Sequence, residues 1–141
     1  MSWQLFAVIS AVAAGVTAVF AKAGLQDVPS HLANAARTAV VLALSLVVLW
    51  WSGEHSKSGQ LTPRTWLFLS LSGLGTAVSW LAYFKALSMG ATTPVTAIDK
   101  ASLAVTMLLA MVFLGERPSW TGGLGVALIV AGSILASLES R

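Results

Sequence analysis

Long apolar stretches alternate with short polar ones along the whole chain, and this alternation is the strongest signal in the sequence. A helix that crosses a bilayer needs about 20 mostly apolar residues, at a rise of about 1.5 Å per residue. Five stretches meet this requirement: residues 3–24, 32–52, 65–89, 94–114 and 120–138. The pattern predicts an all-α membrane protein with five transmembrane helices, organised as a single domain over residues 1–141.

The polar connections fall into two groups, because an odd number of crossings puts the two termini on opposite sides of the membrane. We call the side of the N-terminus side A, which also holds the loops at 52–64 and 115–119. Side B holds residues 25–31, residues 90–93 and the C-terminus. The 52–64 connection, SGEHSKSGQLTPR, is rich in turn-forming residues, as an aqueous loop should be.

The tryptophans distinguish the two sides of this predicted bundle. Tryptophan favours the layer of lipid headgroups at a membrane surface. Five tryptophans fall at side A helix ends: Trp3, Trp50, Trp51, Trp66 and Trp120. Only Trp80 lies deeper in a span. Side A is therefore predicted to carry an aromatic belt that side B lacks.

Composition agrees with a membrane protein and excludes several classes of function. The chain is 57% hydrophobic and 9% charged, whereas an average soluble domain carries about 25% charged residues. The formal charge of +3 is spread along the chain, so no nucleic-acid-binding patch is expected. With no cysteine and two separated histidines, neither thiol chemistry nor a metal site is expected. No hydrolase or metalloprotease motif is present, so we expect neither an enzyme nor a cofactor.

Ionisable residues lie inside the predicted spans, all near side B. They come from four helices and form one predicted charged layer: Lys22, Arg37, Lys85, Asp99 and Lys100. An ionised side chain at the bilayer centre costs about 3 kcal/mol on insertion scales, so the layer needs an explanation. It either lines a polar cavity open to side B, or Lys22 and Arg37 extend to the headgroups while Asp99 pairs with a lysine. We favour the cavity for Lys85, Asp99 and Lys100, because intramembrane ionisable residues are usually functional.

Polar side chains also form stripes at helical spacing that run away from this layer. The stripes are Asn34, Thr38 and Ser45; Ser72, Thr76, Ser79 and Tyr83; and Thr96, Asp99, Ser102 and Thr106. They either line a path or satisfy backbone carbonyls and bond across helices. Trp80 and Tyr83 either supply a flat stacking wall or belong to the core. The candidate substrate-binding residues are therefore Lys22, Asn34, Arg37, Trp80, Tyr83, Lys85, Asp99, Lys100 and Ser102.

The last predicted span differs from the others in its composition. It carries Gly122, Gly123, Gly125 and Gly132 and no ionisable residue before its end at 138. Small residues let helices approach closely in lipid. This span is predicted to be a packing or dimer surface.

Several short motifs follow one another between residues 81 and 132. YFKAL at 83–87 ends one helix, a small-residue turn follows, PVTA at 94–97 starts the next, and FLGER at 113–117 closes it before the glycine-rich span. In this order and spacing the chain resembles the drug/metabolite transporter superfamily, specifically its EamA-type repeat. AIDK at 97–100 is similar to the short, single-repeat bacterial and archaeal branch. The resemblance implies that five helices form one EamA-type half-transporter repeat.

Typical members of that superfamily carry two such repeats in ten helices, inserted in opposite orientations. The resemblance therefore implies transport, with the missing half supplied most simply by a second copy in an antiparallel homodimer. That arrangement requires insertion in both orientations, which the near-balanced positive charge on the two sides permits. We expect a multi-pass protein of the cell inner membrane, in contact with membrane lipid.

The charged layer suggests what such a protein carries. Cations outnumber anions four to one in it, so the leading hypothesis is secondary transport of a small anionic or zwitterionic metabolite by alternating access. Lys85 and Lys100 would hold the negative group, and Asp99 would hold an amino group, order Lys85 or carry a coupling proton. Two alternatives stay open: translocation of a lipid or lipid-linked carrier, and a non-transporting subunit that modulates a partner.

Overall fold

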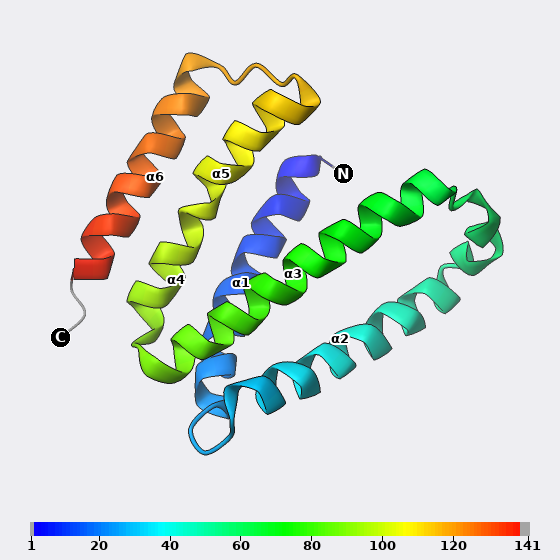
Figure 1. The fold of residues 1–141 in the computed structure, drawn as a ribbon, viewed down its shortest axis with the longest axis horizontal. Coiled ribbons are helices and arrows are strands. Elements are labelled where there is room, and N and C mark those ends of the chain that lie inside the picture. Colours follow the sequence, from blue (N-terminus) through cyan, green and yellow to red (C-terminus); the bar gives the residue numbers. More distant parts are fainter. Residues whose placement is uncertain (1, 139–141) are drawn as a thin grey trace. The chain divides into compact units, whose positions relative to one another are not determined.

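The computed structural model describes residues 2–138, which form helices and connections and contain no strand. The helices in chain order are α1 (Trp3–Gly24), α2 (Ser30–Trp51), the 3₁₀ helix η1 (Glu54–Gln60), α3 (Pro63–Met89), α4 (Thr92–Lys100), α5 (Ser102–Leu109), the π-helical turn η2 (Ala110–Leu114) and α6 (Trp120–Leu138) (Figure 1). Five segments are long and apolar enough to cross a membrane, with α4, α5 and η2 forming one of them over Thr92–Leu114. The predicted all-α membrane fold is confirmed.

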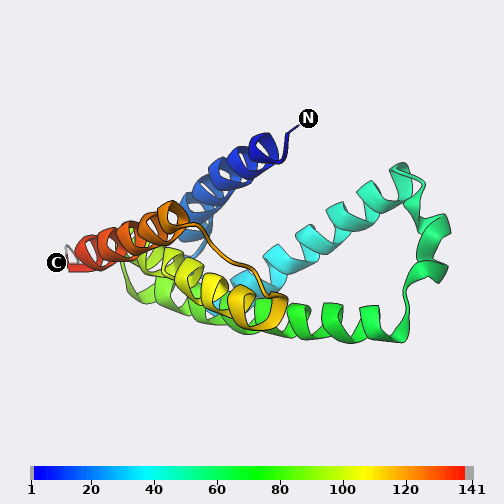
Figure 2. The same ribbon diagram turned by 90° about the horizontal axis from the view of Figure 1, so that it is seen from above.

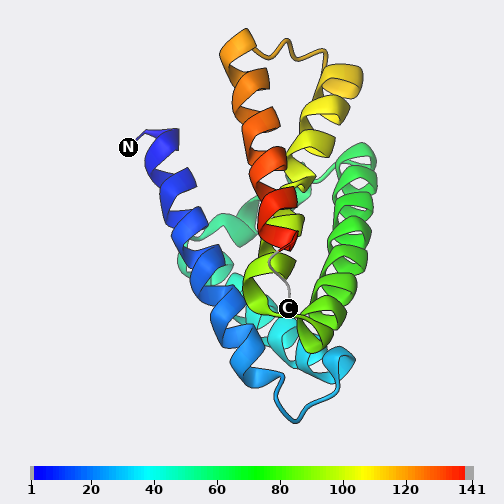
Figure 3. The same cartoon turned by 90° about the vertical axis from the view of Figure 1, so that its left-hand side faces the viewer.

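The described chain divides into two compact units. The first unit combines α1 with α4, α5, η2 and α6, and the second consists of α2, η1 and α3. In the first unit, α6 contacts both α4 and α5 and runs antiparallel to them, beyond the connection at 115–119 (Figure 3). The helix α6 therefore packs within the chain, but a Cβ added at Gly123, Gly125 or Gly132 would meet nothing within 4 Å, so these glycines do not mark a close helix contact here. A role of α6 as a dimer surface stays a prediction.

The fourth span departs from regular α-helix at two positions, and its sequence predicts neither departure. The first is at Ala101, where α4 ends and α5 begins. The amide of Ala101 donates to the carbonyl of Ile98 at 3.0 Å, and the amide of Ala104 donates to the carbonyl of Ala101 at 3.0 Å. These bonds reach back three residues instead of four, so one turn is tighter than an α-helix.

The second departure is the π-helical turn η2, which ends at Gly115. This glycine has φ of +67°, in the left-handed region of backbone conformations. That conformation is unfavourable for residues with a side chain and nearly strain-free for glycine. The amide of Glu116 donates to the carbonyl of Ala110 at 3.2 Å and closes the turn. FLGER therefore stops the helix through its glycine, at the boundary that the sequence predicts.

In the second unit, the first turns of α2 lie near the last turns of α3, and the two helices diverge towards η1 (Figures 1 and 2). The predicted aqueous loop between them contains η1, preceded by Gly53 with φ of +72°. The ring of His55 stacks on Trp50 with centroids 4.7 Å apart and planes 10° apart, which fastens η1 to the end of α2. At this end of the unit, α2 is therefore in contact with η1.

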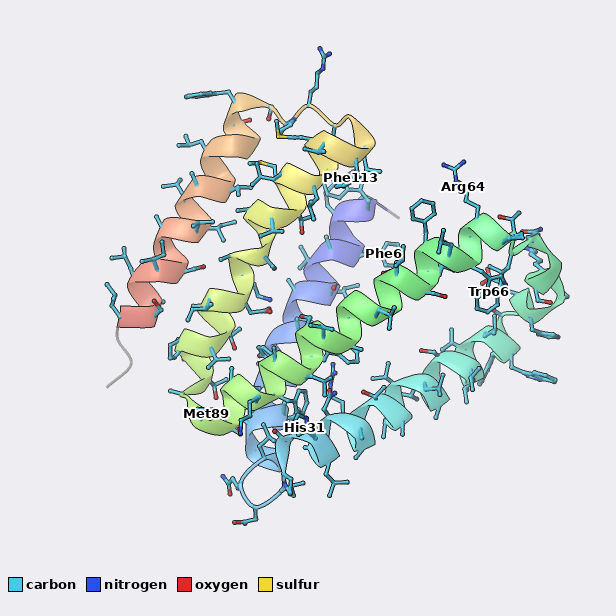
Figure 4. The ribbon with its side chains drawn as sticks, in the orientation of Figure 1. Phe6, His31, Arg64, Trp66, Met89 and Phe113 are labelled. Atoms are coloured by element: carbon cyan, nitrogen blue, oxygen red, sulfur yellow. The ribbon has the colours of Figure 1, made fainter. Side chains whose placement is uncertain are left out.

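The surface of the chain is apolar along its helices. Only Ala18, Leu25, Phe84 and Leu87 are buried hydrophobic residues among those described. The five tryptophans of the predicted belt lie in the first or last turn of a helix and are 57–88% exposed. Figure 4 shows Arg64 and Trp66 projecting in different directions from the first turn of α3, where both residue types suit a headgroup layer.

Candidate functional site

Arg37 of α2 stacks on two aromatic rings of α3 in the second unit. The carbon at the centre of its guanidinium group lies 4.0 Å from the centroid of the Trp80 ring and 5.7 Å from that of Phe84. Trp80 and Phe84 present their rings to the same side because residues four apart share a helix face. Tyr83 meets Phe84 edge to face, with centroids 6.4 Å apart. A cation over an aromatic face gains about 0.5–2 kcal/mol, so this contact holds α2 to α3.

Asn34 lies one helical turn before Arg37 and is buried, with 8% of its surface exposed. Its backbone carbonyl accepts a hydrogen bond from Oγ1 of Thr38 at 2.7 Å. Within residues 2–138, Oδ1 of Asn34 and Nη1 of Arg37 are buried and have no hydrogen-bond partner. Together these atoms offer one acceptor and one cationic donor from consecutive turns of α2.

In the first unit, Asp99 and Lys100 form an ion pair between neighbouring residues at the end of α4. Nζ of Lys100 lies 3.4 Å from Oδ2 of Asp99. Their side chains are 38% and 54% exposed, respectively. The pairing of Asp99 with a lysine, one of the two sequence interpretations, is present. The pair stays open to its surroundings, so it can still exchange partners.

The remaining lysines of the predicted layer differ in their surroundings. Nζ of Lys22 donates to the backbone carbonyl of Gly90 at 2.8 Å, which ties the last turn of α1 to the turn before α4. Lys85 lies on the last two turns of α3 with its side chain exposed. Its backbone carbonyl accepts a bond from Ser88. Lys22 therefore has a structural contact, whereas Lys85 presents its charge outward.

Hydroxyl groups of the predicted stripes bond to their own helices. Thr38, Ser45, Thr76 and Thr106 each donate to the carbonyl four residues earlier, at 2.7–3.1 Å. Ser102 supplies the carbonyl for Thr106 and is exposed. These hydroxyls use their proton on the backbone, which is the second of the two interpretations of the stripes. Their oxygens keep acceptor capacity only.

Two open hollows, one on each unit, lie away from the candidate residues. One is lined by Leu44, Ser45, Val48, Leu49, Ser52 and Glu54, next to η1. Another is lined by Thr106, Leu109, Ala110, Phe113 and Leu114. Within residues 2–138, no three of the histidine, aspartate and glutamate side chains gather as a metal site. The candidate chemistry therefore rests on the charged and aromatic clusters.

A family model described as the EamA-like transporter family matches residues 1–138. The chain belongs to the EamA-like transporter family. This EamA-like chain is 42% identical over 137 residues to "Uncharacterized transporter in cobO 3'region" of Sinorhizobium sp, and the alignment covers 97% of each protein. No solved structure matches it. Together with its five apolar spans, the family identifies a multi-pass integral membrane transporter.

A second relative is much longer than this EamA-like chain. The chain is 34% identical over 88 residues to "Chloramphenicol-sensitive protein RarD" of Pseudomonas aeruginosa. The alignment covers 57% of this chain but 28% of the other, which makes that protein about twice as long. The chain therefore corresponds to about half of that relative in length.

The sequence analysis did not identify Phe84, which packs with Trp80 against the guanidinium group of Arg37. It is 3% exposed and contributes the second ring under Arg37. The signal was present in the sequence, because Phe84 follows Trp80 by four residues and shares its face of α3. The sequence left Trp80 and Tyr83 as either a stacking wall or core residues, whereas the structure brings Trp80 and Phe84 to Arg37.

Proposed function

We propose that this EamA-like chain is one half of a secondary transporter for a small anionic or zwitterionic metabolite. Two copies in antiparallel orientation would form the working unit in the cell inner membrane and operate by alternating access. The observation that supports this most is the charge imbalance within the charged layer near side B, where the four cations Lys22, Arg37, Lys85 and Lys100 accompany one carboxylate, Asp99. A membrane-embedded cation is costly unless protein, water or a counter-ion accompanies it.

The charge imbalance supports an anionic group on the substrate. Asp99, the one carboxylate among these charges, already has Lys100 as its partner at 3.4 Å. Lys85 and Lys100 are exposed and carry flexible point charges, so both fit a role in attracting and holding a negative group. When substrate arrives, Lys100 leaves Asp99 and binds the negative group. The carboxylate of Asp99 then binds either the amino group of a zwitterion or a coupling proton.

Two observations support a second copy as the missing half. Transporters of this general kind place the substrate near the membrane midplane between two inverted repeats, and this chain has the length of about one half of its P. aeruginosa relative. The ion pair of Asp99 and Lys100 is also exposed on a span. Ionised groups at membrane depth usually face protein or a water-filled cavity, and a second copy provides both.

Uptake into proteoliposomes tests this proposal. The purified chain is reconstituted, and uptake of labelled amino acids and organic acids is measured with and without a proton or sodium gradient. Asp99→Asn and Lys100→Ala are each expected to reduce uptake at least about tenfold, because each removes a charge from the proposed site. Lys57→Ala on η1 removes a charge outside the spans and should leave uptake unchanged. Equal uptake by all four proteins would remove the charged layer from the mechanism.

A further inference from the structure

Two buried atoms on one face of α2 have hydrogen-bonding capacity that residues 2–138 do not use. They are Nη1 of Arg37, a cationic donor, and Oδ1 of Asn34, an acceptor. Residues three apart on a helix are neighbours on its surface. Buried polar atoms in folded proteins almost always have a partner. An unused donor and an unused acceptor this close together point to a ligand that bonds both.

The aromatic rings fix the orientation of Arg37 without using its donors. Guanidinium is planar, and its five N–H groups lie in that plane and point outward from its edge. The contacts with Trp80 at 4.0 Å and Phe84 at 5.7 Å engage the group through ring faces. Nη1 of Arg37 is therefore held in place with a donor that residues 2–138 leave unused. Such pre-organisation lowers the entropy lost when a ligand binds.

Charge and geometry together narrow the class of ligand. The guanidinium fork matches a planar carboxylate, which accepts two parallel hydrogen bonds. Oδ1 of Asn34 needs an N–H or O–H donor at a short distance from that carboxylate. An amino or hydroxyl group on the carbon next to the carboxylate meets both needs. A water molecule could bridge the two atoms, but it leaves the guanidinium charge uncompensated within a span.

We propose that Arg37 and Asn34 form a recognition site for an α-amino or α-hydroxy carboxylate, with Trp80 and Phe84 as its support. Its role as a substrate site rests on the transport function proposed above, and it narrows the substrate class of that function. The lysines of the charged layer attract a negative group but do not fix its orientation. The planar guanidinium of Arg37 and the amide of Asn34 orient the ligand through directional hydrogen bonds. The carboxylate binds Arg37, and the neighbouring amino or hydroxyl group donates to Asn34.

Matched trios of ligands test the proposed recognition directly. The purified full chain in detergent is titrated with alanine, lactate and propionate; with phenylalanine, phenyllactate and phenylpropionate; and with aspartate, malate and succinate. Within a trio only the group on the α-carbon changes. Unfolding temperature gives the affinity, because a ligand that binds the folded state stabilises it. In at least one trio, the member without an α-donor should bind about tenfold more weakly or worse, since it leaves Asn34 unpaired.

Substitutions at Asn34 separate recognition from stability. Asn34→Asp places a carboxylate of the same size beside Arg37, so it should raise the unfolding temperature without ligand and abolish stabilisation by every trio. Asn34→Leu removes the acceptor and keeps Arg37, so the members of a trio should bind equally. Arg37→Lys keeps the charge without the planar fork and should weaken binding by about tenfold or more. Leu42→Ala, an exposed position on the same helix, serves as the control and should bind as the wild type does.

The outcomes separate this site from the transport proposal. Stabilisation by no trio, equal stabilisation by all members of every trio, or undiminished binding by Asn34→Asp would each overturn the site. Binding that depends on Asn34 without any uptake into liposomes keeps the site and overturns transport. Uptake that is unaffected by Asn34→Asp keeps transport and overturns the site. If Arg37→Lys does not fold, the two Asn34 variants still test whether the recognition site exists.

Discussion

At the scale of single residues, the chain accommodates its intramembrane charges in three different ways. Arg37 is stacked on aromatic rings, Lys22 donates to a backbone carbonyl, and Asp99 and Lys100 pair with each other. The first two contacts use the charge to hold parts of one unit together. The third is exposed and joins neighbours in sequence, so it stabilises the fold least.

The stack under Arg37 predicts a loss of stability when the indole is removed. Trp80→Leu should lower the free energy of unfolding in detergent by about 1–2 kcal/mol, because the cation then lies over no ring at that position. Trp80→Phe keeps a smaller ring and should lose less than half of that. Trp66→Leu is the control, since Trp66 is 57% exposed at a helix end and should shift stability by less than about 0.5 kcal/mol. Equal losses at Trp80 and Trp66 would contradict a structural cation–π contact.

The contact of Lys22 predicts a similar effect in the first unit. Lys22→Met keeps the length of the side chain and loses the charged hydrogen bond to the Gly90 carbonyl. The free energy of unfolding in detergent should fall by about 1–2 kcal/mol, and Lys22→Arg should restore most of it. Lys57→Met, on η1, is the comparison and should have little effect. If Lys22→Met is as stable as the wild type, the bond from Lys22 to Gly90 does not stabilise the first unit.

The sequence shows which charges lie inside the spans, but it does not show what their side chains contact. Helical spacing and apolar surroundings identified Lys22, Arg37, Asp99 and Lys100 as unusual. The open atoms of Asn34 and Arg37 depend on side-chain rotamers and on the way α2 meets α3, and no sequence period encodes either. The role of Phe84 could have been found from its spacing to Trp80, but a buried phenylalanine in an apolar helix has no signal of its own.

At the scale of elements, helix ends were predictable where residues typical of helix ends stand in the sequence. The first span was predicted at 3–24 and is Trp3–Gly24, and the last was predicted at 120–138 and is Trp120–Leu138. Tryptophan at a headgroup layer and the proline or glycine nearby supply those signals. The interruption at Ala101 was not predicted, because alanine between lysine and serine is compatible with a continuous helix.

The glycine that ends the fourth span can be tested against a glycine inside a helix. Gly115→Ala should lower the free energy of unfolding in detergent by about 1–2 kcal/mol, because alanine pays for a left-handed backbone. Space is not the cause, since nothing lies within 4 Å of the added Cβ. Gly73→Ala in α3 has equal space and a helical backbone, so it should gain about 0.5–1 kcal/mol. The same sign at both positions would contradict this explanation of the helix stop.

At the scale of the whole molecule, the distribution of positive charge between the two membrane sides decides how the chain inserts. Side A carries Lys57, Arg64 and Arg117 in water or at helix ends. Side B carries Arg141, which lies outside the described residues, together with the cations inside the spans. Orientation follows mainly the lysines and arginines of short loops. A small change in loop charge should therefore set the orientation of the whole chain.

The antiparallel homodimer makes a whole-molecule prediction that a parallel dimer does not. His55→Lys with Ser58→Lys adds charge to side A, and Gln26→Lys with Asp27→Lys adds charge to side B, so each double variant should insert in one orientation only. Either variant alone should transport at least about tenfold less than the wild type, because one orientation supplies only one of the two inverted halves. Expressed together, the two variants should restore uptake.

Because the chain has no cysteine, Ser2→Cys gives a single label whose accessibility in intact cells reports the orientation of each protein. Ser58→Gln and Gln26→Ser change the same loops without charge and should behave as the wild type. Full uptake by one double variant alone, with its label on one side only, would exclude the antiparallel pair.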